Sequence, residues 1–182
     1  MNISLESIVI IIDILIFTIY VAYTLISFGI PVNLSITYYK FERKKKGTGI
    51  LFPLLMLLLC GSAIPIWIAI TPKGISEMFV CFPTITLISL LSVAGSARYK
   101  SRHNLIYFHY TCAIIAAICA VAWIFVVAYK FVYIGLTILF TLLYAGKRTK
   151  TLRKCTLFWL ETAAFYSILF TMLAIKITPI QL

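Results

Sequence analysis

The chain alternates between six apolar runs and short polar segments. The runs cover residues 7–29, 50–71, 76–97, 104–128, 131–146 and 155–176. Each run is about 16–25 residues long, and an α-helix that rises 1.5 Å per residue needs about 20 residues to cross a bilayer. Because lipid offers the backbone no hydrogen bonds, such runs are expected to be helical. The pattern predicts an all-α integral membrane bundle of six transmembrane helices, forming a single membrane domain over residues 1–182.

Small residues and prolines modify this pattern in three of the runs. In the fourth run, alanines four residues apart (Ala113 and Ala117, Ala116 and Ala120) have the spacing that lets helices approach closely. We therefore expect this helix at the centre of the bundle. Pro65 interrupts the second run and should kink it, and Pro83 lies in the first third of the third run, so the sequence predicts helices that are not all straight.

The composition agrees with a membrane environment. Of the 182 residues, 63% are hydrophobic and 12% are charged. Soluble globular domains have about 45–50% apolar and about 25% charged residues. An excess of this size has no soluble core that could hide it, so lipid is the expected solvent.

The charge of the chain, +11, is distributed unevenly between the loops. Thirteen of the sixteen Lys and Arg residues lie in the alternate segments 31–49, 98–103 and 147–154, and the other three lie in the remaining connections or near residue 176. Cytoplasmic loops of membrane proteins carry such an excess. The bias predicts a cell inner (plasma) membrane protein with N-out/C-out topology, so that both termini lie outside.

The basic loops are expected to bind partners at the cytoplasmic face. Anionic lipid head groups attract such loops, whereas nucleic acid is not expected because no basic, aromatic-rich domain exists outside the apolar runs. A protein partner is the second expectation for these loops. The candidate lipid- or partner-binding residues are Lys44, Lys45, Lys46, Arg98, Arg102, Arg148 and Arg153.

The longest polar segment, residues 31–49, contains its own periodicity. Leu34, Tyr38 and Phe41 recur at helical spacing among the lysines and arginines. This predicts a short amphipathic helix that lies along the membrane surface.

Three ionisable side chains fall within the apolar runs, where a charge is costly and often functional. Asp13 lies roughly 9 Å from the outer end of the first run, and His109 and Glu161 lie roughly 9–10 Å from the inner face. At matching depth, His109 and Glu161 could pair and form a catalytic site, with His109 as the base. The alternative is structural: each side chain satisfies polar groups of neighbouring helices.

Other chemistry has little support in the sequence. Metalloprotease, nucleophile-elbow, Walker and dinucleotide motifs are absent. The five cysteines lie in or beside apolar runs, with no C-x-x-C pair, which favours packing over disulfides or metal binding. We therefore predict no metal site and no cofactor.

Several short patches together resemble a known family. They are Pro31, Leu34-Ser35, Thr37-Tyr38-Tyr39, Leu51-Phe52-Pro53, His109-Tyr110 with Ala113, and Phe158-Trp159 with Glu161. The set resembles a family of small uncharacterised multi-pass membrane proteins of gut Bacteroides-type bacteria and their phages. The resemblance implies a bacterial or phage-encoded inner-membrane protein with no assigned activity, and it draws attention to Ser35, Tyr38, His109 and Glu161.

Three functions remain open from the sequence. The favoured one is a non-enzymatic accessory or interaction factor that works through its basic cytoplasmic loops. The second is a small transporter or channel, with Asp13, Pro65 and Pro83 along its path. The third is an enzyme acting on lipid head groups of the inner leaflet, with His109 and Glu161 in its site and Arg98 or Arg102 holding phosphate.

Overall fold

The structure is a computed structural model that describes residues 4–71, 77–97 and 103–178. The regular structure in these residues is helical throughout. The α-helices are α1 (Leu5–Phe28), α2 (Thr37–Lys44), α3 (Leu51–Ile70), α4 (Cys81–Ser96), α5 (His103–Val126), α6 (Val132–Arg148) and α7 (Leu152–Ile177). Short 3-10 turns precede some of them: η1 (Leu34–Ile36), η2 (Thr48–Ile50), η3 (Glu77–Val80) and η5 (Tyr129–Phe131).

Five helices of the described residues, α1, α3, α5, α6 and α7, are long and apolar enough to cross a membrane. The protein is therefore a multi-pass helical membrane protein. The predicted third span, residues 76–97, differs: its α-helix α4 is only 16 residues long and begins at Cys81, after η3. Pro83 thus sits in the first turn of α4, where a missing N–H costs no helical hydrogen bond. At about 24 Å, α4 is shorter than a hydrocarbon core of about 30 Å.

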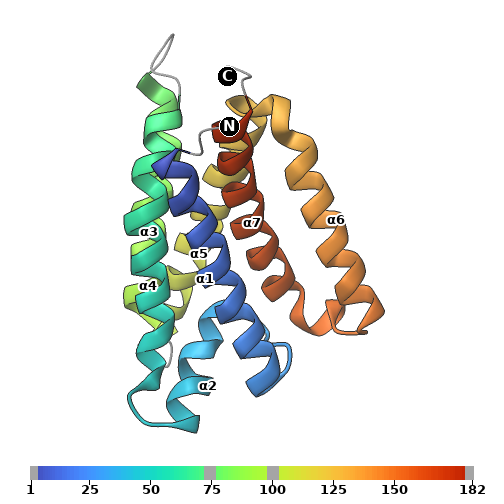
Figure 1. The fold of residues 1–182 in the computed structure, drawn as a ribbon. Coiled ribbons are helices and arrows are strands. Elements are labelled where there is room, and N and C mark those ends of the chain that lie inside the picture. Colours follow the sequence, from blue (N-terminus) through green and yellow to red (C-terminus); the bar gives the residue numbers. More distant parts are fainter. Residues whose placement is uncertain (1–3, 72–76, 98–102, 179–182) are drawn as a thin grey trace.

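The helices α1, α4 and α6 run in one direction and α3, α5 and α7 run in the other (Figure 1). Figure 1 shows the start of α1 and the end of α7 at one end of the bundle, and α2 and the α6–α7 turn at the opposite end. We call the end formed by residues 29–50 and 147–154 the basic end, and the other the termini end. The helix α6 lies at the edge of the bundle, beside α7 (Figure 1).

Two buried clusters divide the interior between these ends. Toward the termini end, the rings of Trp67 and Trp123 meet edge to face at 5.3 Å, and Trp123 Nε1 donates to Thr71 Oγ1 at 3.0 Å. Toward the basic end, Phe17, Phe52 and other large side chains pack together. The interior is therefore apolar over most of its length.

The fourth run, expected at the centre of the bundle, is less buried than the second run. Half of the apolar window of α3 is buried, against one third of that of α5. The helix α3 continues through Pro65 without interruption from Leu51 to Ile70. The more central helices are α3 and α7, because α5 faces outward along much of its length.

The predicted amphipathic helix exists as α2, but its apolar face packs on the protein. Phe41 is 1% exposed, and its ring stacks on Tyr23 at 5.6 Å and meets Phe28 edge to face at 5.0 Å. Leu34 is buried as well. The periodicity therefore predicted the helix correctly, while the surface that it covers is the end of α1.

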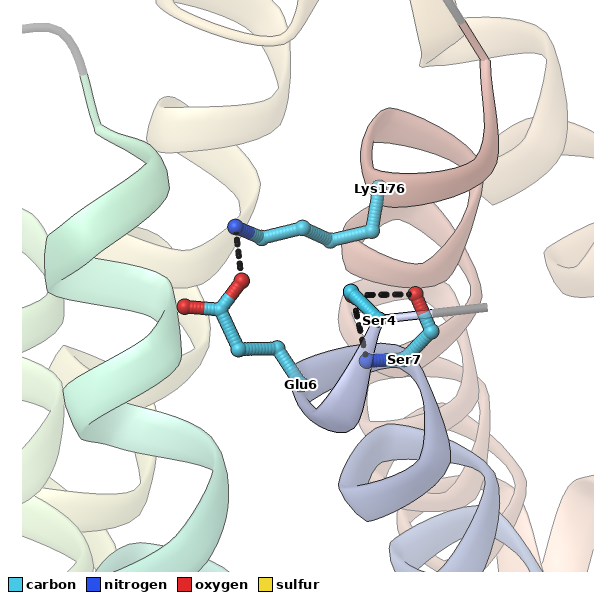
Figure 2. A network of polar contacts seen from close by, with 4 residues as sticks. All are labelled: Ser4, Glu6, Ser7 and Lys176. Atoms are coloured by element: carbon cyan, nitrogen blue, oxygen red, sulfur yellow. Dashed lines mark hydrogen bonds and ion pairs between the residues drawn. The ribbon is translucent and has the colours of Figure 1, made fainter. Parts of the chain in front are cut away.

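The termini end is held by a cap and an ion pair, both drawn in Figure 2. Ser4 caps α1, since its Oγ accepts from the backbone N–H of Ser7 at 3.2 Å. Lys176, near the end of α7, forms an ion pair with Glu6 in the first turn of α1. This pair joins the two helices that carry the termini.

Candidate functional site

A short connection after α1 is bound by hydrogen bonds to the start of α7. We call residues 30–34 the strap. Three hydrogen bonds link it to successive turns of α7: Cys155 Sγ to the Ile30 carbonyl (3.6 Å), Phe158 N to the Val32 carbonyl (3.0 Å), and Leu34 N to Glu161 Oε2 (2.6 Å). The strap therefore runs along α7 for about two turns.

A kink in α7 makes this docking possible. Cys155 has non-helical backbone angles (φ −126°, ψ 29°). In a regular helix the N–H of Phe158 would donate to the carbonyl four residues earlier. The kink frees this N–H, which donates to the Val32 carbonyl instead.

Glu161 accepts a hydrogen bond at the other end of the strap. Leu34 is the first residue of η1, where a backbone N–H has no partner within the helix. The carboxylate of Glu161 accepts this N–H, while Asn33 Oδ1 accepts from Ile36 N (2.8 Å) and Ser35 Oγ (3.0 Å). Glu161 and Asn33 thus satisfy the start of η1 together, which supports the structural alternative for Glu161.

His109 is buried against α4. It is 2% exposed, and its Nδ1 lies 2.8 Å from Ser96 Oγ. Ser96 Oγ also lies 2.7 Å from the carbonyl oxygen of Ser92, an arrangement in which the hydroxyl donates to the carbonyl and accepts from Nδ1. Among the interactions described, the hydrogen bonds of His109 and Glu161 thus lead to different elements, α4 and η1. They do not include the direct pair that the enzyme alternative requires.

Asp13 lies in the other half of the bundle. It is 1% exposed, and its Oδ1 lies 2.7 Å from the hydroxyl of Ser62 on α3, while Oδ2 has no partner among the described residues. Asp13 is not part of the wall of the central cavity. Asp13 therefore contacts a polar group of a neighbouring helix through one of its two oxygens.

The bundle contains a central cavity of about 110 Å³ between α3, α4, α5 and α7. Its wall includes all four alanines whose spacing predicted close helix packing: Ala113, Ala116, Ala117 and Ala120. The small side chains therefore border empty space. Ser35, Thr86 and Glu161 are the only hydroxyl or carboxylate side chains in the wall formed by the described residues.

The carboxylate of Glu42 holds the first basic loop in place. Glu42 accepts hydrogen bonds from the backbone N–H groups of Gly47 (2.9 and 3.0 Å) and Gly49 (3.0 Å). Gly47 has a φ of 88°, a left-handed conformation that favours glycine. Lys45 and Lys46 extend from this turn into an exposed position.

Lys44 is different from its two neighbours, although the sequence groups the three together. Its Nζ donates to Ser27 Oγ at 3.3 Å and lies over the rings of Tyr23 and Phe28 at 5.5 Å. Lys40 reaches the Phe28 carbonyl at 3.4 Å. Cations near the C-terminal end of a helix are favourable, so these two lysines help to hold α2 on α1.

The second basic loop is a tight turn between α6 and α7. Lys150 has a φ of 57°, and its N–H donates to the Lys147 carbonyl at 3.0 Å. Arg148 and Arg153 flank the turn and are exposed. Two further candidates, Arg98 and Arg102, lie outside the described residues.

Comparisons with protein-family models, with curated proteins and with solved structures gave no match. The resemblance to the Bacteroides-type family therefore stays a prediction. Two of its patches meet in space, because the N–H of Leu34 donates a hydrogen bond to Glu161 at the strap junction. Sequence reasoning missed the roles of Ile30, Val32 and Cys155, since two of them act through backbone carbonyls that carry no side-chain signature.

Proposed function

We propose that this protein is a non-enzymatic accessory factor of a bacterial or phage-encoded inner membrane system. Its basic end would face the cytoplasm and bind anionic lipid head groups, and through that contact it would position a partner protein. Both termini would then lie outside. The excess of cations in alternate loops supports this orientation.

The observation that carries the proposal is the exposure of four cationic side chains at the basic end. Lys45, Lys46, Arg148 and Arg153 are exposed, and none of their side chains forms a hydrogen bond or ion pair with another described residue. Both of the loops that carry them are structured turns. The cations are therefore presented on hydrogen-bonded turns, and a support that is ordered before binding lowers the entropy lost on binding a head group.

The two alternative functions gain no comparable support. A transporter of polar solutes needs a polar path, whereas the wall of the central cavity is almost entirely apolar. An enzyme needs His109 and Glu161 in contact, whereas their described hydrogen bonds go to Ser96 and Leu34.

The proposal is tested in nanodiscs that contain a mixture of zwitterionic and anionic phospholipids. The enrichment of anionic lipid around the protein is measured by native mass spectrometry for the wild type and for the double variant Lys45→Gln/Lys46→Gln. Each exposed lysine near a negative surface contributes about 1 kcal/mol, so the double variant should lose most of the enrichment.

The matched control is Lys73→Gln/Lys130→Gln, which removes the same charge from the loops of the opposite side. It should retain the enrichment. Equal enrichment for the wild type and for Lys45→Gln/Lys46→Gln would contradict the proposal. Reporter fusions at residues 147–154 test the orientation separately, and a periplasmic signal there would overturn it.

A further inference from the structure

A groove of about 290 Å³ lies between α5, α6 and α7. It exists because α6 packs mainly on α7 and little on α5. At Gly135 of α6, an added Cβ would lie 3.6 Å from the Cβ of Ser167 on α7, and Ser167 Oγ donates to the Gly135 carbonyl at 3.5 Å. The helix α6 is therefore held against α7, and the space toward α5 stays open.

The floor of this groove is buried, whereas its rim is exposed. Ala163 and Ser167 of α7 and Ala120 of α5 are 2%, 7% and 6% exposed. Phe125 of α5 and Leu160 of α7, which also line the groove, are 54% and 42% exposed. The groove therefore opens to the outside of the bundle, and around a membrane-spanning bundle that environment is lipid.

The chemistry of the groove favours an apolar occupant. Ser167 is the only polar side chain among the described residues that line it, and its hydroxyl already donates to the Gly135 carbonyl. A bound water needs two to four polar partners, and apolar spaces of this kind stay dry. An empty groove would leave its lining atoms without dispersion contacts, so an apolar molecule is expected to fill it.

The size of the groove fits an acyl chain and not a helix. From Phe125 to Ala117 of α5 the groove is about 12 Å long. A helix with a diameter of 10–12 Å would need roughly 900 Å³ over this length. The groove has about twice the volume of about 150 Å³ that holds benzene, which is room for about twelve chain carbons. One leaflet of the hydrocarbon core is roughly 15 Å deep, so such a segment covers most of a leaflet.

A cation lies at one end of the groove. Phe125 and Val132, which line this end, flank the turn η5 that joins α5 to α6. Lys130 in this turn is exposed, and Tyr129 and Tyr133 beside it are 59% and 62% exposed. Tyrosines of this kind are typical of the head-group level of a membrane. The groove thus combines a cation at head-group level with an apolar trough toward the bilayer centre, which matches the polarity of a phospholipid.

From these observations we propose that the groove binds one acyl chain of a phospholipid whose phosphate lies beside Lys130. The chain runs from η5 along α6 toward Leu139. The site is at the termini end, opposite the exposed cations of the basic loops, so it goes beyond the accessory function proposed above. Because zwitterionic and anionic phospholipids share the phosphate, Lys130 does not select between them, and its loss leaves the anionic enrichment at the basic end unchanged.

The test is photo-crosslinking of the full-length protein in nanodiscs. The probes are phosphatidylcholines that carry a diazirine either next to the ester or at the end of one acyl chain, and labelled residues are identified by mass spectrometry. We expect the ester-side probe to label the region of Phe125 and Val132, and the chain-end probe to label the region of Leu139. Both should label the groove several times more strongly than Ile12, which is 47% exposed on α1 and reports bulk lipid.

Filling the groove should remove this excess labelling. Ala117 and Val121 line the groove and are exposed, so a larger side chain there does not overpack the interior. In Ala117→Leu and in Val121→Phe, labelling of the groove should fall to the level seen at Ile12. Ala122→Leu is the matched control, because Ala122 lies on the same helix and does not line the groove, and it should keep wild-type labelling.

The contact with the phosphate is tested by Lys130→Gln. A lysine near a charged lipid surface contributes about fivefold in binding, so labelling of the groove should fall by about this factor. Unchanged labelling in this variant would overturn the placement of the phosphate beside Lys130.

Thermal melting shows whether each filling variant is folded, and two positions are used so that one folded variant suffices. The proposal is overturned if the groove is labelled no more strongly than Ile12, which is also the result expected if another molecule occupies the groove. It is overturned as well if the folded filling variants retain wild-type labelling, or if the two probes label the opposite ends from those expected. Labelling that survives in Lys45→Gln/Lys46→Gln supports it independently of the head-group proposal.

Discussion

The two ends of α7 are both joined to another segment through a carboxylate, but the two junctions are built differently. At the basic end, half-buried Glu161 accepts a backbone N–H from the strap, beside two further hydrogen bonds from the same helix. At the termini end, Glu6 and Lys176 form an ion pair in which the side chains are 43% and 22% exposed. Figure 2 shows this second pair bridging α1 and α7.

The difference lies in what each group would do without its partner. If Glu161 is removed, the Leu34 N–H stays where water has little access, and an unsatisfied buried donor is costly. If Glu6 is removed, Lys176 can still be solvated, so little is lost. Loss of the carboxylate should therefore cost more stability at the basic end than at the termini end, and substitutions at the two ends test this contrast.

The largest effect is expected for Glu161→Leu. This change removes the acceptor of the Leu34 N–H and should lower the free energy of unfolding by about 2–3 kcal/mol. The measurement is an unfolding titration in mixed micelles. Glu161→Gln, whose amide oxygen can still accept the N–H, is the control and should lose clearly less; equal losses for Leu and Gln would contradict the assigned role.

An intermediate effect is expected for Gly146→Ala, also at the basic end. A Cβ at this position would lie 2.8 Å from Trp159 Nε1 and 3.0 Å from Trp159 Cδ1. Overpacking of this kind should destabilise the protein by about 1–2 kcal/mol and should disturb the hydrogen bond from Trp159 Nε1 to Thr151 Oγ1. Tryptophan fluorescence during the same titration reports both effects.

Gly95→Ala serves as the comparison for this substitution, because nothing lies within 4 Å of an added Cβ there. It should be neutral or slightly stabilising, since alanine is favoured over glycine in a helix. A loss as large as that of Gly146→Ala would mean that close contact with Trp159 is not the cause.

The smallest effect is expected for Glu6→Gln at the termini end. An exposed ion pair contributes about 0–1 kcal/mol and weakens as salt is added. Thermal melting at low and high salt should show a small loss that disappears at high salt. Adding Lys176→Gln should cost nothing more, because the pair is already broken; a large, salt-independent loss would make the two ends equivalent.

The strap junction shows how far sequence reasoning reaches at the candidate site. The depth of Glu161 within the membrane run followed from counting residues, and the cost of burying it predicted a polar partner. The partner itself was not predictable, because it is the backbone of Leu34, 127 residues away. The kink at Cys155, which aligns the strap with α7, likewise has no proline or glycine at that residue to mark it.

The alanines of α5 and the lysines at the end of α2 and in the turn after it show the same limit. Small residues four apart permit close packing, yet here they border a cavity. Lys44, Lys45 and Lys46 look equivalent in sequence, but only the first reaches the end of α1. Which residue meets which partner depends on the orientation of whole helices, and local spacing does not specify it.

The sequence by itself determined that the chain is helical and crosses a membrane several times, because the length and hydrophobicity of a run decide this without reference to its neighbours. Tertiary structure alone decided that α4 is short, that the strap lies on α7, and that an apolar cavity remains between α3, α4, α5 and α7. These features arise from contacts between segments far apart in the chain, whose geometry follows only once all the helices are packed.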